Sequence, residues 1–494
     1  MLEILILLVG LPLVGAIIVI ALRPPGVRAV AVVTATITLA LTIYAVVQAF
    51  PKTVIHVFGR MPWLKGLEPT GLFGVLLDPL ASLALIVISG LGFLAVVFST
   101  AYMTDENREQ PLAKGQRRYY HWLLLLLAAM AGLALSPNLL QLFIFWELTT
   151  LCSWALISHT QEEKTMRAGF KALVMTHVGG LFFLVTLFIL FIATKSFAFT
   201  ALARLSPGLK SLVFLFLVIA AWAKAAQIPF HTWLPDAHAE APSPISALLS
   251  GVIVKVAVYA LARIITAFYA ESLTLGIGMV GLGAAIMALV TMFMALALYF
   301  AQDDLKRLLA YSTITHLSYI LLGIAMGMLG SELAFRGGVL HIINHAFAKG
   351  TLFLGAGAIV YMTGTRSIRK LGGLIHRLPH VGVAFVIAVL ALTGVPPLGC
   401  FWSKFYILTG ALDLGGGVGP VILVLVLLES VVSFAWMLRV TQKIFLGPPT
   451  EAVATMQSTR LPLQMTVVLG VLMIMCILAP VIGIKLVMPI PFAR

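Results

Sequence analysis

Four lysines lie within or beside long apolar stretches of the chain, where a charged group is costly to bury. They are Lys224, Lys255, Lys349 and Lys404. Ionisable groups at membrane depth commonly belong to ion or proton pathways. A lysine can exchange between its charged and neutral forms when its surroundings change, whereas an arginine stays charged. This set of residues predicts stepwise movement of protons.

Snorkelling toward the membrane surface is the alternative for each of these lysines, because a long alkyl stem can carry the amine to water. Lys255 lies near the middle of its apolar run, 243–267. Lys404 follows a helix break and lies similarly deep. Depth favours a functional role for these two.

One carboxylate and several histidines complete the candidate set. Glu147 lies inside the apolar run 138–158 without a cationic residue one turn away, so its partner is expected on another helix, and Lys224 is the candidate. A structural ion pair is the alternative to a carboxylate that tunes the lysine. His341, His345 and Lys349 recur every four residues and therefore share one helix face.

Histidine titrates near neutrality, so this face predicts a proton relay. A packed polar seam and a metal site are the alternatives, but no carboxylate stands at zincin spacing. His316 on the preceding run and His231 are further possible relay residues.

Two other groups of ionisable residues carry weaker predictions. The spacing of His231, Asp236, His238 and Glu240 matches no standard metal site, and prolines flank it, so we expect a hydrated loop near the membrane surface. Glu429 is ionisable and lies in an apolar run, and the sequence assigns it no role.

Composition indicates a polytopic membrane protein. Hydrophobic residues make up 61% of the chain and charged residues 10%, against about 25% charged in soluble domains. The net charge of +14 is spread over short loops without a basic stripe, which excludes nucleic acid as a partner. The three cysteines are far apart, and no phosphate-binding loop or haem ligand pair is present. We therefore expect no cofactor, no metal and no redox chemistry on this chain.

Apolar runs long enough to cross a bilayer predict an all-α fold of about fourteen transmembrane helices. They are 2–22, 28–50, 78–102, 119–136, 138–158, 168–194, 210–227, 243–267, 273–300, 307–329, 335–363, 380–411, 417–444 and 462–488. Lysine and arginine concentrate in alternate loops, which predicts that those loops face the cytoplasm and that both termini face outward. The expected location is the inner membrane of a prokaryote.

Three of these runs are predicted to be interrupted. Prolines break the chain after 210–227 and within 380–411, and Lys349-Gly350 gives a weaker signal in 335–363. The two proline breaks lie five runs apart and each has a lysine nearby, which indicates two inverted five-helix repeats. The predicted division is 1–115, the first repeat 116–268, the second repeat 269–446, and a last helix within 447–494.

At this point the chain resembles the antiporter-like membrane subunits shared by respiratory complex I, Mrp-type Na⁺/H⁺ antiporters and membrane-bound [NiFe] hydrogenases. Five motifs carry the resemblance: Phe-Trp-Glu-Leu-Thr-Thr at 145–150, the segment 224–241, Asp-Leu-Lys-Arg-Leu-Leu-Ala-Tyr-Ser-Thr at 304–313, Asn-His-Ala-Phe-Ala-Lys at 344–349, and the Gly-Val-Pro-Pro-Leu-Gly break followed by Ser-Lys at 403–404. Together they span roughly residues 70–450.

The resemblance implies roles for the candidate residues. Glu147 and Lys224 would form the interacting pair and Lys255 the central relay. His341, His345 and Lys349 would connect the two halves, and Lys404 would end the second half. Some relatives carry glutamate at that last position.

The implied function is proton translocation by one membrane subunit of a multisubunit pump. A redox partner module or Na⁺/H⁺ exchange would drive it, and further antiporter-like subunits and lipid would surround it. A sodium-conducting subunit of the same assembly and a secondary transporter of a small solute are the alternatives. Whether the assembly is an oxidoreductase stays open.

Overall fold

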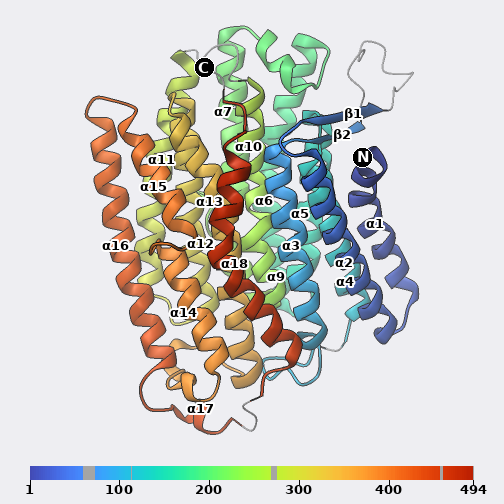
Figure 1. Ribbon diagram of the computed structural model, residues 1–494, viewed down its shortest axis with the longest axis vertical. Helices are drawn as coiled ribbons and strands as arrows, with labels where there is room; N and C mark the ends of the chain where they lie inside the picture. The colour runs from blue at the N-terminus through green and yellow to red at the C-terminus, as the bar shows by residue number, and fades with distance from the viewer. Residues whose placement is uncertain (59–72, 113, 269–274, 457–459, 493–494) are drawn as a thin grey trace.

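The structure is a computed structural model, and it describes residues 1–58, 73–112, 114–268, 275–456 and 460–492 of the 494-residue chain. The chain folds into one bundle of long helices (Figure 1). The two strands β1 (Val54–Phe58) and β2 (Phe73–Leu77) pair antiparallel, with Val54 opposite Leu77, at the end of the bundle where both termini lie.

The helices follow in chain order. They are α1 (Leu2–Ala21), α2 (Pro24–Ala49), α3 (Pro79–Tyr102), α4 (Gln116–Ala134), α5 (Leu139–Ile157), α6 (Glu163–Thr194), η1 (Phe199–Arg204), α7 (Pro207–Lys224), α8 (Trp233–Glu240), α9 (Ser243–Leu248), η2 (Leu249–Ile253), α10 (Lys255–Phe268), α11 (Leu275–Phe300), α12 (Leu305–Met328), α13 (Glu332–Thr363), η4 (Ile368–Lys370), η5 (Leu374–His376), α14 (Pro379–Thr393), α15 (Gly399–Leu412), α16 (Val418–Phe445), α17 (Glu451–Ala454) and α18 (Leu463–Val487).

Every predicted apolar run coincides with helix. Within the described part of the chain, twelve helical segments are long and apolar enough to cross a membrane. The two predicted runs outside that set are 119–136, which lies in α4 behind a polar first turn, and 380–411, which a break divides into α14 and α15. The fold is thus all-α and polytopic.

The two helices that carry the histidines of the candidate relay, α12 and α13, are among the most buried of the bundle. In their most apolar stretches, α12 and α13 are 94% buried and the segment α9–η2–α10 is fully buried, whereas α16 is 28% buried. The outer helices expose apolar side chains such as Val47, Ile192 and Val431. A surface of this kind is stable against lipid or against other membrane proteins.

Both proline breaks are present. Between α7 and α8 the chain runs through Ile228-Pro229, and between α14 and α15 it runs through Pro396-Pro397; each of these peptide bonds is cis. Gly394 ends α14 in the left-handed conformation, φ 92°, which glycine adopts without a Cβ penalty.

The predicted third break at Lys349-Gly350 is wrong. The helix α13 is continuous from Glu332 to Thr363. Gly350 serves close packing, because a Cβ there would meet the side chain of Leu91 at 2.6 Å. The third irregularity lies in the run 243–267 instead, where η2 is a π turn between α9 and α10.

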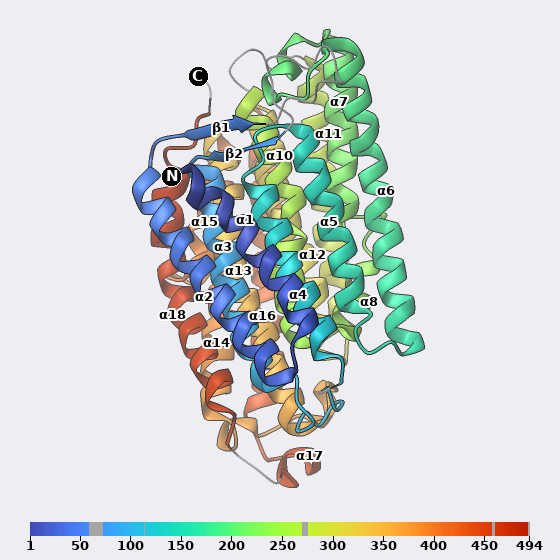
Figure 2. The same cartoon turned by 90° about the vertical axis from the view of Figure 1, so that its right-hand side faces the viewer.

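The basic loops gather at one end of the bundle. The connections α1–α2, α3–α4, α5–α6 and α16–α18 lie at the end opposite both termini (Figure 2). This is the end that the sequence assigns to the cytoplasm. The predicted boundary at 268/269 adjoins residues 269–274, which lie outside the described residues.

Candidate functional site

Lys224 closes the last turn of α7, directly before the first break, and is 1% exposed. Its Nζ donates to the backbone oxygen of Trp146 at 2.8 Å. It also donates to the hydroxyl oxygens of Thr149 and Thr150, at 2.7 and 3.1 Å. The amine lies 4.5 Å from the ring centre of Trp146, close enough for a cation–π attraction. These oxygens and this ring replace the water that a charged lysine needs.

Glu147 faces a different helix from its neighbours in the chain. His177 Nδ1 of α6 lies 2.8 Å from Glu147 Oε2. Gly180, further along α6, leaves room for the carboxylate, which a Cβ at that position would overlap. Among the described residues no ion pair within 4 Å joins Glu147 to Lys224, but the charge of Glu147 still acts on the Lys224 amine from a longer distance. Because an α-helix turns about 100° per residue, Thr149 and Thr150 face the Lys224 amine while Glu147 faces His177 of α6.

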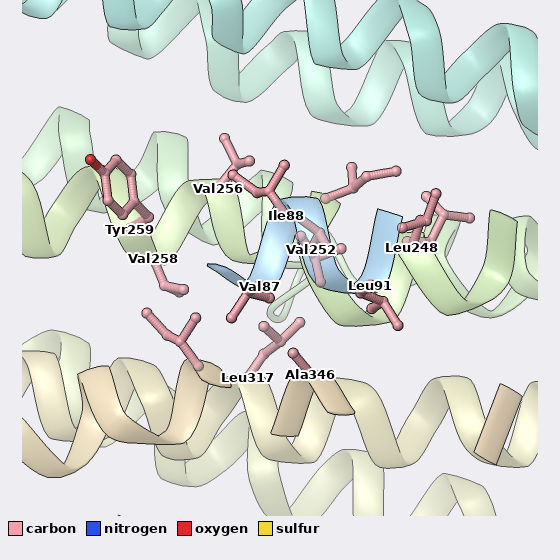
Figure 3. Close-up of a cluster of buried hydrophobic side chains, with 14 of the residues drawn as sticks. Val87, Ile88, Leu91, Leu248, Val252, Val256, Val258, Tyr259, Leu317 and Ala346 are labelled. Carbon is pink, nitrogen blue, oxygen red and sulfur yellow. The ribbon is translucent and has the colours of Figure 1, made fainter. Parts of the chain in front are cut away.

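Lys255 follows the π turn η2 and is 2% exposed. Its Nζ donates to the backbone oxygens of Ser250 and Gly251, at 3.1 and 2.8 Å, which the irregular turn makes available. Figure 3 shows the apolar side chains that pack around this segment, among them Val252 and Val256. A cavity of about 20 Å³ with an apolar lining adjoins Lys255, about the volume that one water needs.

Three histidines form a stacked cluster between α12 and α13. The ring centres of His316, His341 and His345 lie 5.0 to 5.8 Å apart in all three pairs. His316 Nδ1 and His341 Nε2 are 3.0 Å apart, so one donates a proton and the other accepts it. His341 Nδ1 also lies 2.8 Å from Ser403 Oγ of α15. The structure thus brings the predicted His341 and His345 together with the possible relay residue His316.

Lys349 lies two turns beyond His341 on α13 and is fully buried. Its Nζ donates to the backbone oxygen of Leu309 at 2.8 Å. The amine lies 6.0 Å from the ring centre of Phe353. The ring of His238 of α8 stacks on the same Phe353 ring, with ring centres 4.4 Å apart.

His238 is therefore placed differently from the sequence prediction. The segment 233–240 is the helix α8 rather than a hydrated loop, and His238 is fully buried. Neither of its ring nitrogens has a hydrogen-bond partner among the described residues. His231 lies at the start of this segment, partly exposed and outside the histidine cluster.

A polar cavity of about 250 Å³ lies at the end of the basic loops, and residues 239–241, which directly follow His238 in the chain, are part of its lining. Glu109 and Lys306 also line it. Lys306 is 1% exposed, donates to Ala241 O at 2.9 Å and lies 3.9 Å from the Glu109 carboxylate. The cavity thus brings ionisable groups from the surface to the buried segment that holds His238.

Lys404 lies in α15, directly after the second break, and is 6% exposed. Its Nζ is 3.2 Å from both Thr393 O and Ser430 Oγ. It lies 4.6 Å from the ring centre of Tyr319. The Tyr319 hydroxyl in turn donates to the carboxylate of Glu429, which is fully buried on α16.

Three side chains of this region carry potential metal donors. The donor atoms of His316, His341 and Cys400 lie within 4.8 Å of one another. Two of these donors already hydrogen-bond to each other, and the cluster adjoins the amines of buried lysines, which disfavour a divalent cation.

The sequence missed His177 as a partner of Glu147 and gave no role to Glu429. A histidine alone in the long apolar run 168–194 was the available signal for His177, because an isolated polar group at membrane depth requires a partner. For Glu429 the burial was visible in the sequence, but Tyr319 and Ser430 are brought to it only by the fold.

Comparison with known protein families gives two matches, which together cover most of this chain. Residues 136–433 match the family model described as NADH:quinone oxidoreductase/Mrp antiporter, TM, and residues 69–119 match the N-terminal model of NADH-ubiquinone oxidoreductase (complex I) chain 5. All the candidate residues above, from Glu147 to Glu429, lie within the first match.

Relatives of known sequence agree with the family match. The chain is 34% identical over 363 residues to a chloroplastic NAD(P)H-quinone oxidoreductase subunit 5 of Anthoceros angustus, and 36% identical over 361 residues to the organellar chromatophore subunit 5 of Paulinella chromatophora. These alignments cover 69% of this chain but 47% and 51% of the relatives, so the chain spans about half their length.

Two solved structures share the fold. A chain of the Mrp complex from Dietzia sp. DQ12-45-1b is similar with a TM-score of 0.83 and 26% identity, over 98% of this chain and 52% of that one. A chain of the archaeal membrane-bound sulfane sulfur reductase is similar with a TM-score of 0.84 and 26% identity, over 99% and 98%.

Proposed function

The chain belongs to the NADH:quinone oxidoreductase/Mrp antiporter transmembrane family, and we propose that it moves protons as one antiporter-like membrane subunit of a multisubunit pump. The observation that carries this proposal is the set of buried titratable groups in the interior of the bundle. Lys224, Lys255, Lys349 and Lys404 are each at most 6% exposed, and the histidine cluster lies among them.

The lysines are held in a way that suits proton exchange. The Nζ atoms of Lys224, Lys255, Lys349 and Lys404 all donate to backbone oxygens. A carbonyl stabilises the ammonium form without a counter-charge that would fix it, so a nearby change in charge can move the proton. Each transfer between lysines requires water, because their amines bond to separate helices.

The polar cavity beside Lys306 gives protons a route from the end of the basic loops. Its wall 239–241 adjoins His238, and His238 shares the Phe353 ring with Lys349. A buried imidazole with two unpaired nitrogens can accept a proton on one side and release it on the other. Protons entering here would reach Lys349 without passing Lys224.

A sodium path is the alternative within the same fold. Na⁺ requires several oxygen ligands, and the carbonyls that the π turn makes available are Ser250 O and Gly251 O. Both already accept from the Lys255 amine. This arrangement favours protons as the transported ion.

The relatives are subunits of complexes, and other membrane subunits are the partners that this chain would have. The exposed apolar outer helices fit such neighbours as well as lipid. We propose further antiporter-like subunits among them and an energy source outside this chain, either a redox module or Na⁺/H⁺ exchange. A prokaryotic inner membrane is the proposed location, with an organellar membrane as the alternative that the chloroplastic and chromatophore relatives raise.

The test is proton movement by the complete assembly in sealed vesicles, followed with a pH-sensitive dye. Lys224→Gln and Lys404→Gln should each abolish it, and Lys443→Gln, at the exposed end of α16, should leave it unchanged. Native rates in both buried-lysine variants would show that the chain is a structural subunit.

A further inference from the structure

Glu429 is the one carboxylate of the described residues that is fully buried, and neither the sequence nor the family match assigns it a role. It lies on α16, whose most apolar stretch is only 28% buried, so its neighbours come from the inner face alone. An uncompensated carboxylate at this depth is costly. Its contacts therefore indicate what offsets that cost.

A continuous chain of hydrogen bonds joins Glu429 to Lys404. Lys404 Nζ donates to Ser430 Oγ at 3.2 Å, and Ser430 Oγ lies 2.7 Å from the Tyr319 hydroxyl. The Tyr319 hydroxyl donates to Glu429 Oε2. When Ser430 donates to Tyr319, all three bonds point from the amine toward the carboxylate.

On the basis of the proposed function, we propose that Glu429 accepts the proton of Lys404 through Ser430 and Tyr319. In the transfer an N–H bond of Lys404 breaks and an O–H bond forms on Glu429 Oε2. The two hydroxyls each receive one proton and pass on another, so no phenolate remains. The ammonium and the carboxylate both become neutral, and the net charge of the site does not change.

Tyr319 connects this step to the histidine cluster. Its ring stacks against His316 and His341, with ring centres 5.5 and 5.6 Å apart, and lies under the Lys404 amine. Glu429 Oε1 has no hydrogen-bond partner among the described residues, so the carboxylate keeps one free acceptor. A proton that reaches Lys404 therefore finds its next acceptor inside the protein rather than in bulk water.

The experiment uses the assembly purified with its native partners and reconstituted in vesicles. Glu429→Gln should lower proton transport by about 100-fold, the scale of a lost proton-transfer group, and Glu429→Asp should restore part of it. Ser430→Ala leaves both charged groups in place and should lower the rate by about tenfold, equal to about 1.4 kcal/mol of barrier.

The matched control for Ser430 is Thr441→Ala, which removes another buried hydroxyl of α16 that bonds only to its own helix, at Met437 O. It should transport at the native rate. Infrared spectroscopy gives a second measurement, because a purely structural role for Glu429 would produce no protonated carboxyl group. The carbonyl band of a protonated carboxyl group is expected in the native protein during transport and should be absent in Glu429→Gln.

The outcomes separate this inference from the proposed function. If Lys404→Gln abolishes transport while Glu429→Gln and Ser430→Ala assemble and transport at the native rate, the acceptor is not Glu429 and only this inference fails. If Lys224→Gln and Lys404→Gln also transport at the native rate, the proposed function fails as well.

Discussion

The region around Lys224 and the region around Lys404 are built on the same plan with different surroundings. Each lysine adjoins a helix break and lies over an aromatic ring, Trp146 at 4.5 Å and Tyr319 at 4.6 Å. Trp146 is on α5 and Tyr319 on α12, the second helices of the two proposed repeats. This correspondence supports the inverted repeat that the proline breaks predict.

The two regions differ in the partners and the exposure of their carboxylates. Glu147 bonds to His177, whose side chain is 54% exposed on the outer helix α6. Glu429 is fully buried and is linked to Lys404 through Ser430 and Tyr319. The first region is open to whatever lies beside α6, and the second is closed. We propose that a neighbouring subunit acts on the first region, whereas protons pass internally in the second.

The largest expected effect is a loss of stability when Lys404 or Lys224 is replaced with methionine. Lys404→Met leaves Glu429 buried without its cation and should destabilise the chain by about 3 kcal/mol. Lys224→Met leaves Glu147 paired with His177 and should cost less, about 1 kcal/mol. Thermal unfolding of the purified assembly measures both, and Lys404→Met with Glu429→Gln should recover most of the loss. Equal destabilisation by the two single variants would contradict the distinction between the regions.

The second expected effect concerns how protons reach the closed region. His238→Gln should slow proton transport by about tenfold, because the imidazole that precedes the cavity lining 239–241 no longer carries a proton. His159→Gln is the control, a buried histidine at the same end of the bundle. The His159 ring contacts Tyr119 and not the Phe353 ring that His238 and Lys349 share, so its replacement should leave the rate unchanged. Burial and the neighbouring Arg118 lower the pKa of His159 to about 4.

The transport rates of the native, His238→Gln and His159→Gln assemblies are compared between pH 6 and 9. The native and His159→Gln assemblies should give the same pH profile. A native profile in His238→Gln would remove the cavity from the proton route and leave Lys224 as the entry.

Much of the fold follows from the sequence, because long apolar runs and prolines act locally. The helices, the two proline breaks and the four buried lysines were all predictable from spacing and composition. The π turn before Lys255 was not, since it contains no proline and its cause is packing. The continuity of α13 at Gly350 was missed for the same reason, because close contact with Leu91 is a tertiary feature.

The partners of the charged groups were less predictable than their positions. Glu147 and Lys224 were expected to pair, but a rotation of one residue along α5 sends Glu147 toward His177. Residues from four helices, α12, α13, α15 and α16, meet around Tyr319 and Lys404. Such a cluster is determined by helix packing, which no local pattern encodes.

The smallest expected effect concerns Gly180, the glycine of α6 that lies against Glu147 in the region around Lys224. Gly180→Ala places a methyl group against the Glu147 carboxylate and should lower transport roughly threefold by displacing it, since a group displaced by a fraction of an ångström transfers protons less well. Gly278→Ala is the matched control, a helical glycine with open space around its Cβ position, and should transport normally. Equal rates in the two variants would show that the position of Glu147 does not matter.

The central claim is that protons pass along the buried lysines, and Lys255 tests it most directly, because its amine bonds only to backbone oxygens of its own segment in the described structure. The measurement is the pH gradient formed by the complete assembly in vesicles, native against Lys255→Ala, with and without sodium. We predict that Lys255→Ala abolishes the gradient in both conditions while the assembly remains intact. An unchanged gradient would contradict the relay, and a loss confined to sodium would assign the path to that cation.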